Sequence, residues 1–407
     1  MNITIIGNGP AAISALETIR GIDKSCEITI VSKEKEDAYS PCFLANYLSG
    51  EIEKDKLYLR GKRFYDEQMV ETIFGNPVTE IIFKDRKVKL KSGRELCYDF
   101  LLIAAGSNPI IPELPNIAGN GIFSFKTISD IDNIMSSIKN VNAAVVMGSG
   151  FIGLEAACAL KKRGINVTVI EKEDKVLPRM LDNEMAEIVR SHMEKNGVRI
   201  ITGAVIKSIQ RKQGEVEGVQ VDKESIPCGL LVIAAGVRPN LEMMRGDSIR
   251  TNYGVIVDDR MRTSCADVYA VGDIAEMDIQ GVRKINPIWF NAVKGGEIAG
   301  FNIMGIKRRY AVPLIDMNTV TLFGMPILSV GIQKGVSMVK RRRDGKGIRK
   351  VYLDENGRIN GVQLIGYVEL GGLYLSIINR HISYIDKSAR KTGMLFGGGI
   401  FNKGYPL

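Results

Sequence analysis

Residues 143–153 read AAVVMGSGFIG, and residues 3–12 read ITIIGNGPAA. In both stretches a short apolar run leads into a glycine-rich turn, and a helical pattern follows, over 154–163 in the later copy. A further apolar strand comes after each helix, at 27–31 and at 167–170. Each copy therefore predicts a β-α-β unit with a dinucleotide-binding fingerprint, GxGxxA in the first and GxGxxG in the second.

The small residues of the two fingerprints stand where dinucleotide binding needs them. The first glycine permits the tight turn from strand to helix, the second lets backbone N–H groups approach a pyrophosphate, and the third small residue lets helix and strand pack closely. The start of the helix adds N–H groups and a partial positive charge that favour an anion. These residues are Gly7, Gly9 and Ala12 in the first unit and Gly148, Gly150 and Gly153 in the second.

The residues after the second strand of each unit predict which ribose is bound. Glu171 stands 23 residues after Gly148, where a carboxylate accepts the ribose 2′-OH of NAD and repels the 2′-phosphate of NADP. Lys172 follows directly and weakens the preference for NAD over NADP. In the first unit Ser32 takes the place of the acid and Glu34 is the nearest carboxylate, so either is a candidate for the adenosine ribose. A turn without nucleotide is the alternative for the second unit.

Composition excludes several classes of protein. With 407 residues the chain is long enough for two or three domains, and 25% charged against 45% hydrophobic residues excludes a disordered chain. The six cysteines form no CxxC pair and there are only two histidines, His192 and His381, so we expect no metal site, zinc ribbon or clustered iron–sulfur centre. The most apolar long stretch, 141–160, holds a glutamate and three glycines, so we expect no membrane span. No secretory signal is recognisable at the start, and we expect a cytoplasmic, reducing location.

Positive charge is concentrated towards the C-terminus. The net charge is +9, and residues 311–407 carry 14 Lys and Arg against 6 Asp and Glu. The densest run spans 340–350, with the turn-forming pair Asp344-Gly345 inside it and Asn356-Gly357 after it. This pattern predicts two exposed strands with solvated basic side chains. An acidic protein partner is the second interpretation, and nucleic-acid binding is a third that we do not favour.

Three further segments carry a resemblance to a known family. Residues 98–106 read YDFLLIAAG, residues 231–240 read LVIAAGVRPN, and residues 267–273 read DVYAVGD after Thr263-Ser264. Together with the two glycine turns, they resemble the two-dinucleotide flavoproteins of the pyridine nucleotide–disulfide oxidoreductase family, over roughly residues 1–330.

The resemblance implies a fold, a domain order and two cofactors. The fold class is α/β, with two Rossmann-like dinucleotide-binding domains, one for FAD and one for NAD(H), and a C-terminal α+β interface domain. The NAD unit is inserted into the FAD domain. The expected segments are 1–107 and 243–310 for FAD, 108–242 for NAD and 311–407 for the interface domain, which is compatible with a homodimer or with a subunit of a larger complex.

The resemblance also assigns roles to residues. Asp273 would hydrogen-bond the ribityl chain or pyrophosphate of FAD, Val78 would contact adenine through its backbone, and Glu155 would lie near the nicotinamide. The full cofactor-binding set that it implies is Gly7, Gly9, Pro10, Ala12, Ser32, Glu34, Val78, Ala105, Gly106, Gly272 and Asp273, together with Gly148, Gly150, Ile152, Gly153, Glu171 and Gly236.

Three residues bear on the second substrate. Cys42 stands where single-cysteine relatives, the NADH oxidases and coenzyme A disulfide reductases, place a redox thiol, although a small buried residue is the alternative. Pro10 replaces the acid–base histidine of oxidase relatives, which disfavours oxygen or peroxide as the acceptor. Trp289, within IWFNA, resembles the tryptophan beside the flavin of ferredoxin reductases; an ordinary packed aromatic is the alternative.

The prediction is an FAD-dependent, NADH-linked oxidoreductase. Its leading partner is an acidic electron carrier of the ferredoxin or rubredoxin type, or an iron–sulfur subunit, with electrons able to flow towards NAD. The alternative is reduction of a small disulfide, coenzyme A disulfide or persulfide through Cys42. Cys42, Glu155 and Trp289 are the expected catalytic residues. A non-enzymatic flavoprotein within a larger assembly is a third hypothesis.

Overall fold

The structure is a computed structural model, and it describes residues 1–244, 248–279, 282–310, 317–341 and 347–380. The chain divides into two compact units. The first comprises 1–110, 126–128 and 237–310 of the described chain, and the second comprises 111–125, 129–236 and 317–380. The four-segment division expected from the sequence stays a prediction. His381 and the turn pair Asp344-Gly345 lie outside the described residues.

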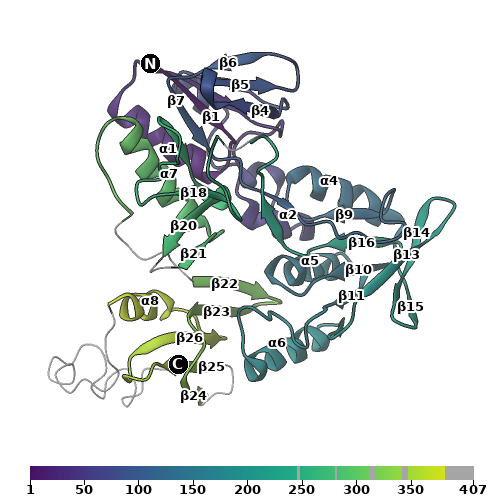
Figure 1. The fold of residues 1–407 in the computed structure, drawn as a ribbon. Coiled ribbons are helices and arrows are strands. Elements are labelled where there is room, and N and C mark those ends of the chain that lie inside the picture. Colours follow the sequence, from purple (N-terminus) through teal and green to yellow (C-terminus); the bar gives the residue numbers. More distant parts are fainter. Residues whose placement is uncertain (245–247, 280–281, 311–316, 342–346, 381–407) are drawn as a thin grey trace. The chain divides into compact units, whose positions relative to one another are not determined.

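The first unit is built on a five-stranded parallel sheet in the order β19-β7-β1-β2-β3 (Figure 1). Its strands are β1 (Asn2–Ile6), β2 (Glu27–Val31), β3 (Val70–Ile73), β7 (Phe100–Ile103) and β19 (Val268–Ala270). Leu101, Leu102 and Ile103 of β7 are all fully buried. A continuous apolar run of this kind is typical of a central parallel strand covered on both faces.

Two long helices of this unit pack closely against each other. They are α1 (Pro10–Ile22) and α7 (Trp289–Ile303), which lie side by side although the sequence separates them widely (Figure 1). Gly296 of α7 makes this possible, because a Cβ atom there would lie 2.1 Å from the carbonyl oxygen of Ala11. The packing therefore places the middle of α7 against the first turn of α1, directly after the first glycine turn.

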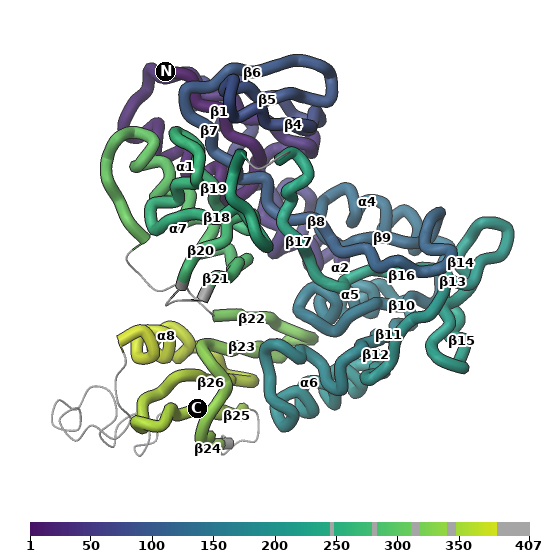
Figure 2. Tube along the Cα trace, in the orientation of Figure 1, coloured from purple at the N-terminus to yellow at the C-terminus, as the bar shows by residue number. Residues whose placement is uncertain are grey.

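Smaller elements complete the first unit. They are the antiparallel sheet β4 (Val78–Ile82), β5 (Lys87–Leu90) and β6 (Glu95–Cys97); the sheet β18 (Val255–Val257), β20 (Ala275–Ile279) and β21 (Val282–Lys284); and the short helices η1 (Pro41–Phe43), α2 (Leu44–Ser49), η2 (Lys54–Leu57), α3 (Phe64–Glu67), η3 (Phe83–Asp85) and η5 (Gly272–Ile274). The strands β8 (Ser107–Pro109) and β17 (Val237–Pro239) pair antiparallel (Figure 2), next to two of the points where the chain passes between the units.

The second unit contains a second five-stranded parallel sheet, in the order β12-β11-β10-β16-β9. The elements of this part are β9 (Ile122–Ser124), α4 (Ile128–Ser137), η4 (Ile138–Asn140), β10 (Ala143–Met147), α5 (Phe151–Lys162), β11 (Asn166–Ile170), α6 (Asn183–Lys195), β12 (Val198–Ile201) and β16 (Leu230–Ile233). The hairpin strands β13 (Ile206–Lys212), β14 (Glu215–Val221) and β15 (Glu224–Pro227) form a separate sheet. The sequence predicted that this helix begins at Leu154. In the structure, α5 begins three residues earlier, directly after Gly150.

The same unit holds a five-stranded antiparallel sheet, β22-β23-β26-β25-β24. Its elements are β22 (Met317–Leu322), β23 (Met325–Gly331), β24 (Val336–Arg341), β25 (Ile348–Leu353), β26 (Ile359–Ile365) and the helix α8 (Gly371–Asn379). Leu328, Val330, Val362 and Tyr374 belong to the buried cluster between sheet and helix. With this α+β part and the two parallel sheets, the predicted fold class is confirmed.

The prediction that the basic run is wholly solvated was wrong for two residues. Its two strands are present, since β24 and β25 pair antiparallel. Arg349, however, is buried and donates from Nη1 to the Tyr374 hydroxyl at 2.9 Å. Lys350 is only 12% exposed and pairs with Asp182 and Glu184. Both side chains are held by contacts with residues far away in the sequence, which the local pattern does not reveal.

None of the helices in the described chain is both long enough and apolar enough to cross a membrane.

Candidate functional site

The first glycine turn joins β1 to α1. Gly7 has a φ of +106°, and a Cβ there would lie 2.1 Å from the carbonyl oxygen of Ala104, so only glycine fits. Gly9 is different, because a Cβ built on it meets no atom within 4 Å. Gly9 is the N-cap of α1. No side chain caps the start of this helix, and Pro10 lies in its first turn. The turn thus leaves open space in front of uncapped N–H groups, which suits a pyrophosphate.

Other predicted residues of the first unit gather at the same edge of its sheet. Ser32 follows β2, Ala105 and Gly106 follow β7, and Gly272 follows β19. Because these strands are parallel to β1, their carboxyl ends meet where the glycine turn begins. A Cβ on Gly272 would lie 3.4 Å from that of Ala11, on the first turn of α1.

The two ribose candidates differ in what their side chains already bind. The Ser32 hydroxyl is buried and accepts a hydrogen bond from the Glu34 backbone N–H at 3.1 Å. The Glu34 carboxylate accepts a hydrogen bond from the Tyr39 hydroxyl at 2.6 Å. Val78 opens β4 and is half-buried. Their roles towards adenosine stay predictions.

Asp273 belongs to a polar cluster that the sequence did not reveal. Ser107 donates to its carboxylate at 2.7 Å, and the Lys126 ammonium lies 3.1 Å from the Ser107 hydroxyl and 3.4 Å from the carboxylate. The three residues come from places far apart in the sequence. The sequence motif identifies Asp273 alone, so the sequence did not predict that Lys126 and Ser107 join it. An ammonium in this position can also attract the phosphates of a dinucleotide.

The second glycine turn, in the other unit, repeats the geometry of the first. Gly148 has a φ of +102°, and a Cβ on it would lie 2.5 Å from the carbonyl oxygen of Ala234. A Cβ on Gly153 would lie 2.0 Å from the carbonyl oxygen of Gly148, whereas one on Gly150 would meet nothing within 4 Å. The start of α5 has no side-chain cap. Both turns therefore fit the pyrophosphate groups that their sequences predict.

Two further residues of the NAD prediction lie close to this turn. Ile152 is on the first turn of α5 and is exposed, and Gly236 lies shortly after β16, which is a parallel neighbour of β10.

Glu171, the predicted acceptor of the ribose 2′-OH, accepts hydrogen bonds within the chain, and its role towards the ribose stays a prediction. It is 5% exposed, and its Oε2 accepts from the backbone N–H and the hydroxyl of Ser149 at 2.7 and 2.8 Å. Its Oε1 accepts from the Glu173 N–H at 3.0 Å. The carboxylate thus holds the residue between the first two glycines. Lys172 is exposed and pairs with Glu173 at 3.6 Å.

Glu155 is half-buried on α5, one turn after Gly150. Burial raises the pKa of its carboxyl to about 7. At neutral pH this carboxyl therefore changes readily between its protonated and ionised forms, as a group that gives or takes a proton must do.

The residues expected at the second substrate lie in the first unit. Cys42 is exposed in η1, and the neighbouring Phe43 is 49% exposed. Trp289 is the first residue of α7 and is half-buried, while Phe290 beside it is 61% exposed. Neither thiol nor indole is a fully buried core group.

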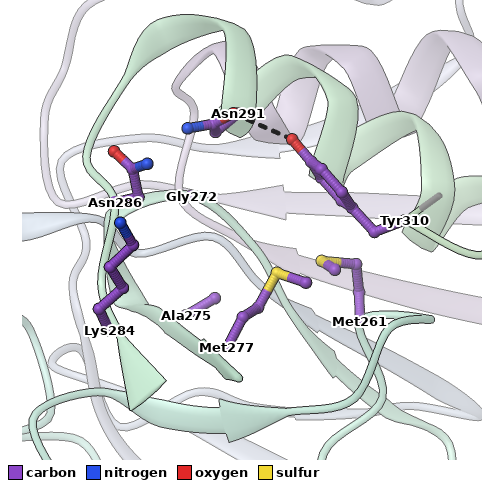
Figure 3. Close-up of a pocket in the computed structure, with 9 residues that line it drawn as sticks. Met261, Gly272, Ala275, Met277, Lys284, Asn286, Asn291 and Tyr310 are labelled. Carbon is purple, nitrogen blue, oxygen red and sulfur yellow. Dashed lines mark hydrogen bonds between the residues drawn. The ribbon is translucent and has the colours of Figure 1, made fainter. Parts of the chain in front are cut away.

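A small pocket opens beside the first turns of α7 (Figure 3). Tyr310 donates from its hydroxyl to Asn291 Oδ1 at 3.0 Å. Burial raises the pKa of this tyrosine to about 12, so the hydroxyl keeps its proton at neutral pH and stays a donor. The other residues that line the pocket are Met261, Gly272, Ala275, Met277, Lys284, Asn286 and Gly295.

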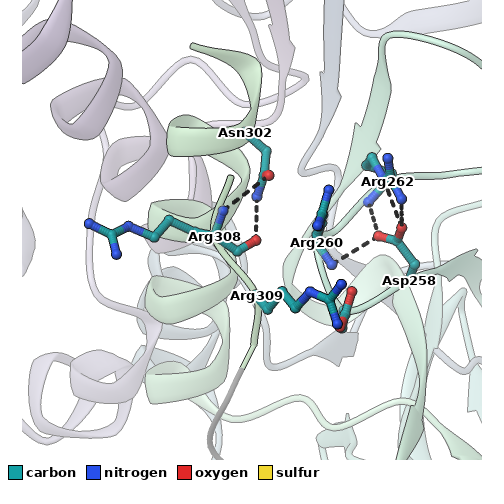
Figure 4. Close-up of polar contacts among 7 residues, drawn as sticks. Asp258, Arg260, Arg262, Asn302, Arg308 and Arg309 are labelled. Carbon is teal, nitrogen blue, oxygen red and sulfur yellow. Dashed lines mark hydrogen bonds and ion pairs between the residues drawn. The ribbon is translucent and has the colours of Figure 1, made fainter. Parts of the chain in front are cut away.

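A basic cluster lies near the other end of α7 (Figure 4). Arg262 makes a two-pronged ion pair with Asp258, and Arg309 lies 3.5 Å from Asp259. The Arg308 guanidinium lies 5.2 Å from the centre of the Phe301 ring. The cluster comprises four cations, Arg260, Arg262, Arg308 and Arg309, against the two carboxylates Asp258 and Asp259.

In the part of the chain that the structure describes, no three His, Cys, Asp or Glu side chains are grouped so that they could hold a metal ion.

Comparison with known proteins gives consistent results. The family model described as "Pyridine nucleotide-disulphide oxidoreductase" matches residues 1–296. An "NADH oxidase" of Methanocaldococcus jannaschii is 33% identical, over 90% of this chain and 88% of that protein. A "Rubredoxin-NAD(+) reductase" of Ectopseudomonas oleovorans is 29% identical, over 77% and 82%. The solved structure of a "NAD-Dependent Persulfide Reductase from A. fulgidus" is 26% identical with a TM-score of 0.88, over 94% and 78%.

The open space at Gly9 generates a prediction for FAD. Gly9→Val should fold, because a Cβ meets nothing within 4 Å, yet it should be purified without FAD, because the side chain occupies the space left for the pyrophosphate. The flavin absorbance per protein measures this. Gly21→Ala, in the same helix and also without neighbours within 4 Å, is the control and should stay yellow. A Gly9→Val protein that keeps its FAD would contradict the placement.

The raised pKa of Glu155 predicts a pH dependence of stability. The folded chain holds this proton more tightly than the unfolded chain, whose carboxyl titrates near 4.5, so stability falls as pH rises from about 4.5 to 7. Glu155→Gln has no such proton to lose. Between about pH 5 and pH 8 its melting temperature should therefore fall less than that of the wild type. Equal falls in both proteins would show that the pKa is not raised.

Proposed function

The chain belongs to the pyridine nucleotide-disulphide oxidoreductase family, and on that basis we propose that it exchanges electrons between NAD(H) and an acidic iron–sulfur carrier protein or partner subunit. That it is an FAD-containing, NAD(H)-dependent oxidoreductase follows from the family itself. The proposal concerns the second substrate and the residues that serve each step.

The two glycine turns bind different cofactors in our proposal. In our proposal the turn at 7–12 and the Asp273 cluster hold FAD, and the turn at 148–153 holds NAD(H). Bound FAD accepts an electron pair as hydride and can release electrons singly, which is the chemistry that links a nicotinamide to a one-electron carrier. Glu155 then serves as the group near the nicotinamide that holds or releases a proton at its carboxyl.

We favour a carrier protein as the acceptor because Phe290, beside Trp289 at the start of α7, is exposed. Partly exposed aromatic side chains of this kind are common at the centres of protein interfaces. The basic cluster at the other end of α7 supports an acidic partner, because an excess of cations raises the association rate of an anionic protein. The similarity to a rubredoxin-NAD(+) reductase agrees with this choice.

A second function is favoured by Cys42. Its thiol is exposed, and one similar solved structure is that of a persulfide reductase. The Cys42 thiolate would attack one sulfur of a small disulfide or persulfide and release the other as a thiolate or hydrosulfide. The mixed disulfide or persulfide left on Cys42 then needs two electrons, which NADH supplies.

Cys42→Ser separates the two functions. If a carrier protein is the acceptor, this variant should reduce an oxidised acidic rubredoxin or ferredoxin with NADH at most of the wild-type rate, because serine retains the size and exposure of the side chain. Cys97→Ser, which changes another exposed cysteine of the same unit, is the control. Loss of nearly all turnover in Cys42→Ser alone would reject the carrier and establish the thiol as a redox group.

A further inference from the structure

The loop from Glu171 to Asp182 connects β11 to α6 and contacts the second glycine turn at its start and middle. Glu171 accepts the two hydrogen bonds from Ser149 described above. The backbone N–H of Leu177 donates to the carbonyl oxygen of Ser149 at 3.0 Å. Ser149 is fully buried and stands between Gly148 and Gly150. The shape of the pyrophosphate turn therefore depends on where this loop lies.

The end of the same loop is held by the antiparallel sheet of the second unit. The carbonyl oxygen of Met180 accepts hydrogen bonds from Ser329 Oγ at 3.0 Å and from Gln363 Nε2 at 3.1 Å. Both donors are buried. A buried carbonyl with two side-chain donors is costly to displace, since each donor would lose its partner.

Two residues of β25 hold the last residue of the loop. The Asp182 carboxylate accepts from the Tyr352 hydroxyl at 2.5 Å and lies 2.5 Å from Lys350 Nζ. Lys350 also reaches Glu184 at 3.1 Å. The other carboxylate oxygen of Asp182 caps α6 by accepting from the Met185 N–H at 3.0 Å. Hydrogen bonds with a charged partner are stronger than neutral ones, and the low exposure of Lys350 limits screening by water.

The backbone of the loop is strained between its contact with Ser149 and its attachment at Asp182. Leu177 has a φ of +47°, a left-handed conformation that is rare for a leucine, and its side chain is 1% exposed. Such a conformation persists only where the surrounding structure fixes it, and it is concentrated at ligand sites. If the attachment at Asp182 is released, the strain at Leu177 favours movement of the N–H that now binds Ser149.

We propose that Lys350 and Tyr352 are positioning residues for dinucleotide binding: through Asp182 they fix the 171–182 loop, and the loop fixes the turn around Ser149. The inference rests on the proposed function in one respect, that NAD(H) binds at residues 148–153. It adds that the antiparallel sheet helps to set the affinity for NAD(H). Because such coupling is reciprocal, a bound dinucleotide also stabilises the contacts of β25.

The test uses two variants of the full FAD-loaded chain, Tyr352→Phe and Lys350→Met. Both keep most of the side-chain volume and remove a donor to Asp182. Calorimetric titration should give dissociation constants for NAD⁺ and ADP-ribose raised by about tenfold, the usual size of such a coupling. The kcat at saturating NADH should be unchanged, because neither residue touches a reacting group. Amides of 172–182 should exchange hydrogen faster than in the wild type.

Arg199→Met is the matched control, since it breaks an ion pair with Glu224 in the same unit, 2.9 Å long and more than half exposed. Its dissociation constants should equal those of the wild type. The proposal is overturned if Tyr352→Phe and Lys350→Met also bind NAD⁺ and ADP-ribose as the wild type does, or if Arg199→Met weakens binding equally. A wild-type chain that binds neither ligand would instead refute the proposed function.

Discussion

At the first glycine of each turn, the main chain passes so close to the end of a neighbouring strand that no side chain fits. A Cβ would lie 2.1 Å from a carbonyl oxygen at Gly7 and 2.5 Å from one at Gly148. This close approach puts the start of a helix against the carboxyl ends of parallel strands, where unpaired N–H groups can face an anion. The fold of each unit serves to hold one such turn.

The two turns differ in how they are supported. In the first unit, β19 brings the Gly272 turn, with Asp273, to the first turn of α1, and α7 packs closely on α1 through Gly296. In the second unit, the support comes from Glu171 and from a loop that an antiparallel sheet holds at Asp182. In our proposal, in which each turn holds one dinucleotide, the two binding sites depend on different long-range contacts, and the affinity for one dinucleotide can change without the other.

Local sequence was sufficient for the fold class and for the strands of the two β-α-β units. The predicted strand at 27–31 matches β2, and the apolar run that opens residues 143–153 matches β10, because β-branched residues bounded by turn residues favour a strand. Contacts between distant residues were not predictable. Lys126 lies 147 residues from Asp273 in sequence, and Tyr352 lies 170 residues from Asp182. The sequence of a basic run does not show whether a distant carboxylate pairs with it. The prediction of a solvated Lys350 was therefore wrong.

In our proposal, FAD is the redox centre through which NADH and a carrier protein exchange electrons. Anaerobic titration of the purified flavoprotein with NADH, followed by the flavin absorbance, tests this most directly. We expect complete bleaching of the flavin at one equivalent of NADH per FAD, with Cys42 taking no electrons. Consumption of two equivalents per FAD would contradict it, because a second redox group would then accept an electron pair, and the exposed Cys42 thiol is the candidate.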